Sequence, residues 1–315
     1  MRKCGSFRIV DLDMCCHSLD GVLVLDKPEG RSSAFVDFLC KKILGVKKIG
    51  HIGTLDPFAT GVLPLALNAG TKAIPYIKSG RKVYDFEVRF GIKTDTADKT
   101  GCVVSTSGII PSAAQIEAVL PRFIGEISQT PPAFSAIKVG GKRAYDLARH
   151  GKIPAIKPRV VNVFDLRLLA SSPEYKLRAE VSPGTYIRAL IEDIATALGT
   201  VAHASSLRRI QDGRFLLSHS ISLDALQERR NNLGGVLISL EDVLDDIPVI
   251  SVSCQDAEGL LFGRCVRVDF SGDYGVYLAS AEGGFLEIVD YKKSATNSGG
   301  IINPRKLLRK NWKGE

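Results

Sequence analysis

Apolar residues follow two kinds of spacing along the chain, and each predicts its own kind of element. Continuous or alternating apolar runs predict strands at residues 21–26, 61–67, 82–90 and 160–169. Helical spacing predicts helices at 111–123, 142–150 and 186–198. Another helix is expected after Ser32 or Ser33, whose hydroxyl can cap its first turn, with Gly45 at its end. These elements mix helix and strand without the regular alternation of a doubly wound sheet.

The composition changes near residue 247 and indicates a second, smaller unit. Pro248 opens short strand patterns that are interrupted by glycines. Residues before about 20 carry no periodicity and predict a loose extension. We therefore expect an N-terminal extension over 1–20, a large domain over 21–246 and a small β-rich domain over 247–315.

Composition and charge indicate a folded protein and favour some classes of binding partner over others. A hydrophobic fraction of 45% with 24% charged residues is typical of a folded globular protein. The 42 Lys and Arg exceed the 34 Asp and Glu, which gives a formal charge of +8 and a pI near 9.1. This excess favours an anionic partner such as nucleic acid, although a modest excess also serves solubility alone.

The cysteines and the apolar runs indicate a cytoplasmic protein without a metal site. The seven cysteines are odd in number and contain no Cys-x-x-Cys pair, which argues against a disulfide framework or a zinc cluster. Cys15, Cys16 and His17 are the nearest to a metal group, but adjacent residues in a short leader rarely converge on one ion. No apolar run reaches the roughly 18 residues that span a bilayer, and the N-terminus lacks a signal-peptide segment.

Asp56 is the first candidate for chemistry. It lies in a Gly, Thr and Pro-rich loop before the strand at 61–67, a common place for a catalytic group. Pro57 fixes its own φ and moves Asp56 out of the helical region, so the carboxylate is held on a stiff turn. An Asp-Pro turn is by itself more often structural.

Two aromatic positions and one arginine are further candidates. If residues 184–188 are extended, Tyr186 and Arg188 share a face and could stack a base and hold a carboxylate. The alternative is a tyrosine over the core and an arginine in a surface ion pair. Tyr84 shares a strand face with Lys82 and Phe86, and the pattern leaves open whether it is a core residue or a stacking platform.

A one-sided basic stretch follows in the middle of the chain. It contains Lys138, Lys142, Arg143, Arg149, Lys152, Lys157 and Arg159 around Tyr145, and Asp146 is its only acidic residue. Such a stretch suits RNA phosphates and an exposed base, or it is simply a solvated face.

Six blocks in this order resemble the TruB-type tRNA pseudouridine synthases. The blocks are residues 21–28, 51–64, Tyr84 with 91–98, 131–138 with Tyr145, 184–188 and 207–209. The resemblance covers residues 21–245 and is weaker beyond them. Ile52 departs from the pattern, since the family usually has a small or hydroxylated residue after the histidine.

The resemblance implies an α+β pseudouridine synthase fold, with a mixed, largely antiparallel sheet flanked by helices and a small PUA-like RNA-binding domain. It implies isomerisation of uridine 55 in the T loop of tRNA without metal or organic cofactor. Asp56 is then the catalytic carboxylate, and Arg188 keeps it ionised and aimed. Tyr84 stacks on the target base and takes the C5 proton.

The resemblance also implies substrate contacts. His51, Tyr186 and Leu207 would hold the flipped-out base and its neighbours, and Lys27 would lie near the cleft. The C-terminal cations Arg264, Arg267, Arg305, Lys306, Arg309 and Lys310 would contact the acceptor stem.

Two other functions remain as alternatives. A non-catalytic tRNA-binding or folding factor would not need Asp56, Tyr84 and Arg188 together. A guide-RNA-dependent, dyskerin-like synthase is disfavoured by the short C-terminal segment without a long basic tail. We expect a monomeric enzyme that acts alone on tRNA.

Overall fold

The computed structural model describes residues 19–135, 137–151, 155–171, 174–282, 284–294 and 299–309. Most of the expected extension over 1–20, with Cys15, Cys16 and His17, lies outside the described residues, as do Lys152 and Lys310. Within the described ranges, no helix is long and apolar enough to cross a membrane.

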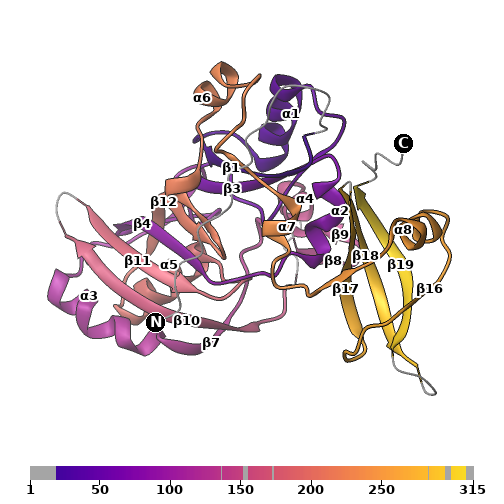
Figure 1. Cartoon of the computed structure of the whole chain (residues 1–315). Coiled ribbons are helices and arrows are strands. Elements are labelled where there is room, and N and C mark those ends of the chain that lie inside the picture. The colour runs from indigo at the N-terminus through magenta and orange to yellow at the C-terminus, as the bar shows by residue number, and fades with distance from the viewer. Residues whose placement is uncertain are drawn as a thin grey trace.

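A ten-stranded sheet forms the larger part of the molecule (Figure 1). Its main path runs β14-β1-β3-β12-β4-β11-β10-β7, with β2 against β3 and β13 against β12. The named strand pairs of this sheet are antiparallel except β12 with β3, so the expected mixed, largely antiparallel sheet is confirmed. The strands are β1 (Gly21–Lys27), β2 (Ile49–His51), β3 (Thr60–Leu67), β4 (Lys82–Phe90), β7 (Gly125–Gln129), β10 (Arg159–Ala170), β11 (Tyr175–Val181), β12 (Ala202–Asp212), β13 (Phe215–Leu216) and β14 (Leu237–Ile238).

Helices and two short hairpins surround this sheet. The α-helices of this part are α1 (Ser33–Leu44), α2 (Gly70–Ala73), α3 (Ala113–Val119), α4 (Ala144–Arg149), α5 (Ile187–Ala197), α6 (Leu223–Glu228) and α7 (Leu240–Val243). The 3₁₀ turns are η1 (Ile74–Tyr76), η2 (Leu120–Phe123) and η3 (Leu217–His219). The hairpins pair β5 (Ile92–Thr94) with β6 (Val103–Thr106), and β8 (Lys138–Val139) with β9 (Lys142–Arg143).

The caps of α1 are those expected from the sequence, whereas two other helices differ from their expected bounds. Ser32 accepts a bond from the Phe35 amide at the start of α1, and Gly45 ends α1 in the left-handed region, both as expected. The helix expected at 111–123 is divided into α3 and η2, where Pro121 stands near the start of the tighter turn. The helix expected at 142–150 begins only at Ala144, because Lys142 and Arg143 pair in a hairpin.

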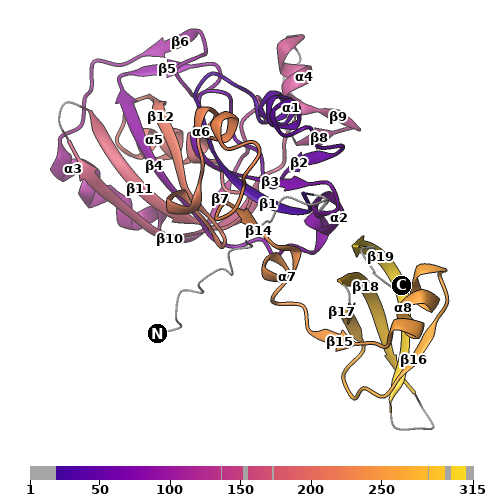
Figure 2. The same cartoon turned by 45° about the horizontal axis from the view of Figure 1, so that its top comes forward.

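The C-terminal part is a five-stranded sheet, which confirms the expected β-rich unit. Its order is β15-β17-β18-β19-β16, from β15 (Val249–Ser251), β16 (Val266–Val268), β17 (Gly275–Ala281), β18 (Phe285–Lys293) and β19 (Gly300–Arg309), and α8 (Cys254–Leu261) packs on it. Figure 2 shows this block set apart from the main sheet and joined to it through the segment that contains α7.

A small shared core joins the two parts. Leu240 and Leu244 from the α7 segment and Ala73 from α2 pack with Leu278, Leu286, Ile288 and Leu308 of the C-terminal sheet. Lys72 also donates a 2.8 Å hydrogen bond to the Leu307 carbonyl. Burial of these apolar side chains stabilises the contact between the two sheets.

Gly61 lies where the backbones of β3 and β12 come very close together. It has φ of +99°, and a Cβ there would lie 2.2 Å from the Arg209 carbonyl oxygen, where β3 and β12 pair in parallel. We expect Gly61→Ala to lower the free energy of unfolding by about 3 kcal/mol or more, because it combines strain with a backbone clash. Urea denaturation measures this, with Gly108→Ala as control, since a Cβ at Gly108 meets no atom within 4 Å. Equal stability of the two variants would contradict it.

Candidate active site

The loop between β2 and β3 carries Asp56 and is anchored on both sides of it. The Ser33 hydroxyl accepts a 3.0 Å bond from the Leu55 amide and donates a 2.9 Å bond to the Leu55 carbonyl. Leu55 and Phe58 are buried in the core. The amide of Ala59 bonds back to the Asp56 carbonyl at 3.1 Å and closes the turn. These contacts fix the backbone, so the Asp56 carboxylate has a defined direction.

Arg188 faces this carboxylate from the first turn of α5. Its Nε lies 2.9 Å from Asp56 Oδ2, and its Nη2 lies 3.1 Å from Asp56 Oδ1. Only 3% of the Arg188 side chain is exposed, so the alternative of a surface ion pair is wrong. The chain becomes helical at Ile187, as the helix expected at 186–198 requires, so the alternative of an extended stretch through Arg188 does not apply. Guanidinium and carboxylate nevertheless meet as the resemblance implies.

Further contacts hold the Arg188 guanidinium in place. Nη1 donates to the Thr96 carbonyl at 2.7 Å, and Nη2 donates to the Phe134 carbonyl at 2.9 Å. The buried carboxylate of Asp98 lies 3.6 Å from Nη1. Asp98 is itself fixed by the hydroxyl groups of Thr96 and Thr100, at 2.9 and 2.6 Å. The guanidinium is therefore positioned independently of Asp56.

Two opposing effects act on the ionisation of Asp56. Burial raises the pKa of its carboxyl group, the Arg188 guanidinium beside it lowers that pKa, and the charge of Asp98 raises it again. Some 31% of the Asp56 side chain still faces the cleft, so the carboxylate remains accessible. Contact of both oxygens with Arg188 favours the ionised form, the form in which a carboxylate acts as a nucleophile or a base.

Lys27 lies beneath the loop rather than in the cleft. Its side chain is fully buried, and its ammonium donates to the carbonyls of Arg31, Pro28 and Pro57 at 2.7, 2.9 and 3.2 Å. Burial lowers the pKa of Lys27 to about 8, against the opposing charge of Asp56. With its N–H groups directed at three backbone carbonyls, Lys27 positions the catalytic loop and presents no donor to a substrate.

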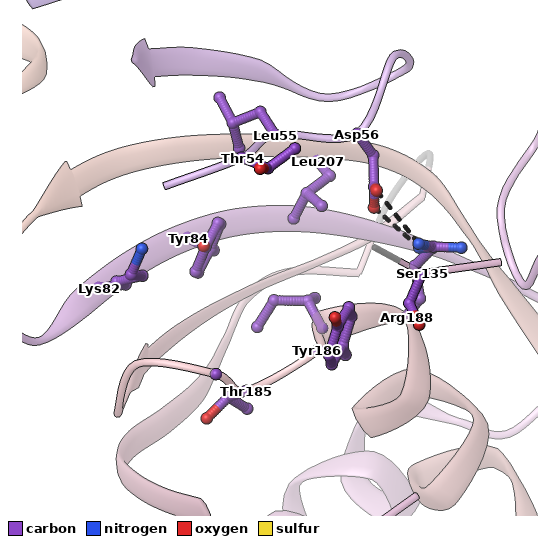
Figure 3. A pocket seen from close by; sticks show the side chains of 12 residues that line it. Thr54, Leu55, Asp56, Lys82, Tyr84, Ser135, Thr185, Tyr186, Arg188 and Leu207 are labelled. Atoms are coloured by element: carbon purple, nitrogen blue, oxygen red, sulfur yellow. Dashed lines mark hydrogen bonds and ion pairs between the residues drawn. The ribbon is translucent and has the colours of Figure 1, made fainter. Parts of the chain in front are cut away.

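A cleft opens beside Asp56 and contains most of the residues that the sequence singled out. It is lined by Thr54, Leu55, Asp56, Lys82, Tyr84, Ser135, Gly184, Thr185, Tyr186, Ile187, Arg188 and Leu207. Figure 3 shows Asp56 and Arg188 at one end, Lys82 at the other and Tyr84 between them. Lys27 and His51 are not among the lining residues. Five of the seven expected site residues therefore meet in one cavity.

His51 lies at the end of β2 and does not line the cleft. Its Nδ1 is 2.6 Å from Asp37 Oδ2, and its Nε2 is 3.4 Å from the Thr54 hydroxyl. Thr54 itself lines the cleft, so His51 supports its wall from outside.

Tyr186 is fixed at the edge of the cleft by a residue that the sequence did not reveal. Gln129 is fully buried, and its side-chain amide accepts from the Tyr186 N–H at 2.8 Å and donates to the Tyr186 carbonyl at 3.1 Å. The guanidinium of Arg159 lies 5.0 Å from the centre of the Tyr186 ring. Backbone and ring are thus both restrained, and nothing in the local sequence of Gln129 marks this role.

Tyr84 is both a core residue and part of the cleft wall. Only 7% of it is exposed, and it packs in the main hydrophobic core. Burial raises the pKa of its phenol, and the charge of Arg209 opposes that rise. The phenol is therefore protonated at neutral pH.

The cleft offers no set of metal ligands. Among the described residues, no group of three or more His, Cys, Asp or Glu side chains could hold a metal ion. The ionisable side chains that line the cleft are those of Asp56, Arg188, Lys82, Tyr84 and Tyr186.

Comparison with known proteins places the chain in one family. Residues 41–187 match the model of the TruB family pseudouridylate synthase N-terminal domain, and residues 188–245 match that of the tRNA pseudouridylate synthase B C-terminal domain. The chain is 42% identical to tRNA pseudouridine synthase B of Gluconacetobacter diazotrophicus, over 79% of this chain and 83% of the relative. It is 38% identical to the protein of that name in Rickettsia akari, over 88% and 96%.

A solved structure shares the fold. The match is a chain in the crystal structure of a Cbf5-Nop10-Gar1 complex, with a TM-score of 0.67, 25% identity and coverage of 93% of this chain and 86% of that one. The family models and the relatives near 40% identity name the family that the sequence resembles. The chain therefore belongs to the TruB family of pseudouridylate synthases.

Proposed function

We propose that the protein converts uridine 55 in the T loop of tRNA to pseudouridine. The observation that carries this proposal is the Asp56 carboxyl group, 2.9 Å from the Arg188 guanidinium in a cleft with two tyrosines, in a chain of the TruB family. We further propose that it acts as a monomer in the cytoplasm, without metal or organic cofactor.

The reaction needs one group at the ribose and a surface on which the base can turn. The bond from C1′ to N1 breaks, the uracil rotates, and a bond from C1′ to C5 forms while C5 loses a proton and N1 gains one. Asp56 assists either as nucleophile at C1′ or by taking the C2′ proton. Both routes require the ionised carboxylate that Arg188 favours.

The cleft residues supply a place for the flipped-out base. Extrusion from the loop stack costs a few kcal/mol, which stacking on side chains offsets. We assign Tyr84, Tyr186 and Leu207 to this contact, since all three line the cleft. A phenol that stays protonated is a weak base, so stacking is the better supported of the two roles expected for Tyr84. His51 would act through the cleft wall and Lys27 through the loop backbone.

The basic hairpin is suited to RNA phosphates. Lys138, Lys142 and Arg143 are exposed on β8 and β9. The segment before this hairpin begins at the cleft, where Ser135 lines the cavity and the Phe134 carbonyl binds Arg188. A T loop bound at Asp56 would therefore lie beside a cationic surface.

The direct test is pseudouridine formation on an unmodified tRNA transcript, with EDTA and without any other RNA or protein. Conversion at position 55 and at no other uridine is the expected result. Binding without conversion would favour a non-catalytic tRNA factor. Conversion that required an added guide RNA would favour the guide-dependent function.

We propose that residues 247–315 form a PUA-like RNA-binding domain beside a catalytic domain over 21–246. Arg305 pairs with Asp290, and Arg309 pairs with Glu241. The other three described candidates are Arg264, Arg267 and Lys306, which are exposed and have no carboxylate partner among the described residues. These three are therefore the better candidates for phosphate contacts.

Replacement of Arg264, Arg267 and Lys306 by Gln is expected to weaken tRNA binding and to reduce its salt dependence. Loss of three phosphate contacts lowers the slope of log affinity against log salt by about 2 to 3. Titrations between 50 and 200 mM salt measure the slope, with Arg305→Gln as a control that removes a paired cation. An unchanged slope in the triple variant would exclude these residues from the RNA interface.

A further inference from the structure

A second charged cluster includes Lys82, which lies at the end of the cleft away from Asp56 (Figure 3). Lys82, from β4, lines the cavity, and its ammonium lies 2.9 Å from Asp212 Oδ2. Arg209 is fully buried beneath it and places its Nη1 3.1 Å from the same oxygen. Two cations therefore share one carboxylate, which leaves a local positive charge.

The catalytic loop is shaped around this cluster. Gly53 has φ of +71°, and a Cβ there would lie 3.0 Å from both Lys82 Nζ and Asp212 Oδ2. Arg209 also donates to the Val62 carbonyl at 2.7 Å, so its guanidinium is held from the β3 side. The head of Lys82 is consequently fixed between the loop that carries Asp56 and the end of β12.

Lys82 is placed to donate into the cleft. Its side chain is 13% exposed, and Asp212 is the acceptor that its ammonium contacts within the described part of the chain. An ammonium has three N–H donors, so two remain for a ligand. A buried cation with unused donors at the wall of a binding cavity favours an acceptor on the ligand.

The geometry of uracil determines which acceptor would arrive there. With the ribose at Asp56 and the base along Tyr84, the atom farthest from the glycosidic nitrogen N1 is C4, with its oxygen O4. Rotation of the base about the axis through N3 and C6 exchanges N1 with C5 and O4 with O2. A carbonyl oxygen therefore points to the far end of the cleft both before and after the rotation.

We propose that the Lys82 ammonium, held by Asp212, binds the carbonyl oxygen of the target uracil that points away from the ribose: O4 in the substrate and O2 in the product. This inference rests on the proposed function. Lys82 is then a catalytic residue that specifies uracil, because cytosine carries an amino group at position 4 and would present a donor to a donor.

The same contact assists the bond cleavage. When the bond from C1′ to N1 breaks, its electron pair leaves with the uracil and is delocalised over N1, O2 and O4. A cation at the distal oxygen stabilises that negative charge until C5 bonds to C1′ and loses its proton. Burial lowers the pKa of Lys82 and Asp212 opposes this shift, so the carboxylate helps to keep the donor charged.

Lys82→Met tests the contact, because it leaves Asp212 paired with Arg209. The single-turnover rate at saturating RNA is expected to fall by about 10- to 150-fold, the effect of losing a hydrogen bond to a charged group. Affinity for the RNA should stay within about threefold, since phosphate contacts lie elsewhere. Lys93→Met, which removes a lysine paired with Glu192 outside the cleft, is the matched control. Should Lys82→Met not fold, Lys82→Gln keeps a neutral donor toward Asp212 and serves the same comparison.

A substrate change identifies the partner atom. RNA with 2-pyrimidinone at the target lacks O4, and its missing N3 proton affects wild type and variant alike. We expect the wild type to lose much more rate on this base than the variant does. An equal loss in both, or a Lys82 effect confined to RNA affinity, would overturn the inference while leaving the proposed function intact. A wild type that converts no uridine would overturn both.

Discussion

Asp56→Ala is expected to bind T-loop RNA as tightly as the wild type and to form pseudouridine at least about 10⁴-fold more slowly. The carboxylate is the acidic group that faces the cleft from the anchored loop, and loss of an essential nucleophile or base has effects of this size. RNA affinity should persist because the proposed RNA contacts are made mainly by tyrosines and surface cations rather than by Asp56. Single-turnover conversion and RNA titration measure the two quantities separately.

The fold of this variant should be intact, which makes the loss of rate interpretable. Without Asp56, the Arg188 guanidinium still contacts the Thr96 and Phe134 carbonyls, with Asp98 at 3.6 Å. Asp56→Asn is the matched control, because it keeps the size of the side chain and removes its charge. Both variants should be inactive and unfold near the wild-type urea concentration. Residual activity of the Asn variant within tenfold of the wild type would exclude a role for the ionised carboxylate.

The secondary structure was largely predictable from local pattern. The strand expected at 82–90 matches β4, and the serine cap and glycine end of α1 are those of the structure. Hydrophobic periodicity and capping act over a few residues, so both can be read from short segments. The helix expected at 186–198 matches α5 within one residue at each end, but the sequence did not reveal that Gln129, 57 residues away, holds the Tyr186 backbone.

The site was predictable through the family resemblance and not through local pattern. Asp56 and Arg188 are 132 residues apart, and the tertiary fold brings the β2–β3 loop into contact with the first turn of α5. Local rules favoured a surface position for Arg188, since an isolated arginine is usually exposed. Its burial follows from two carboxylates and two carbonyls that surround the guanidinium, and these come from distant segments.

The surroundings of charged residues in strands were the hardest feature to predict from the sequence. Lys27 ends the apolar strand β1 and was expected near the cleft, yet its ammonium is buried against three backbone carbonyls. Lys82 was placed on the face of Tyr84, but its role depends on Asp212, which pairs with it across β4 and β12. Sequence pattern assigns a residue to a face, whereas the partner that makes a buried charge tolerable is set by the tertiary fold.

Arg188→Met is expected to slow pseudouridine formation at neutral pH by about 10²-fold or more and to lower the free energy of unfolding by about 3 to 5 kcal/mol. The stability loss arises because the buried Asp98 and the partly buried Asp56 lose their cation. The rate falls because a group that orients the carboxylate and stabilises its charge is gone. Arg188→Lys is the matched control, since it keeps the charge but cannot face both oxygens of Asp56.

The pH dependence separates this electrostatic role from simple misfolding. Burial already raises the pKa of Asp56, and Arg188 is the strongest influence that lowers it. Without the guanidinium, the pKa of Asp56 rises further. On acidification, Asp56 therefore becomes protonated at a higher pH than it does in the wild type. The acid limb of the rate profile should therefore move to higher pH in Arg188→Met, and the rate should recover in part as the pH is raised. A variant with an unshifted limb and a uniformly lower rate would show that Arg188 acts on the fold of the site and not on the charge of Asp56.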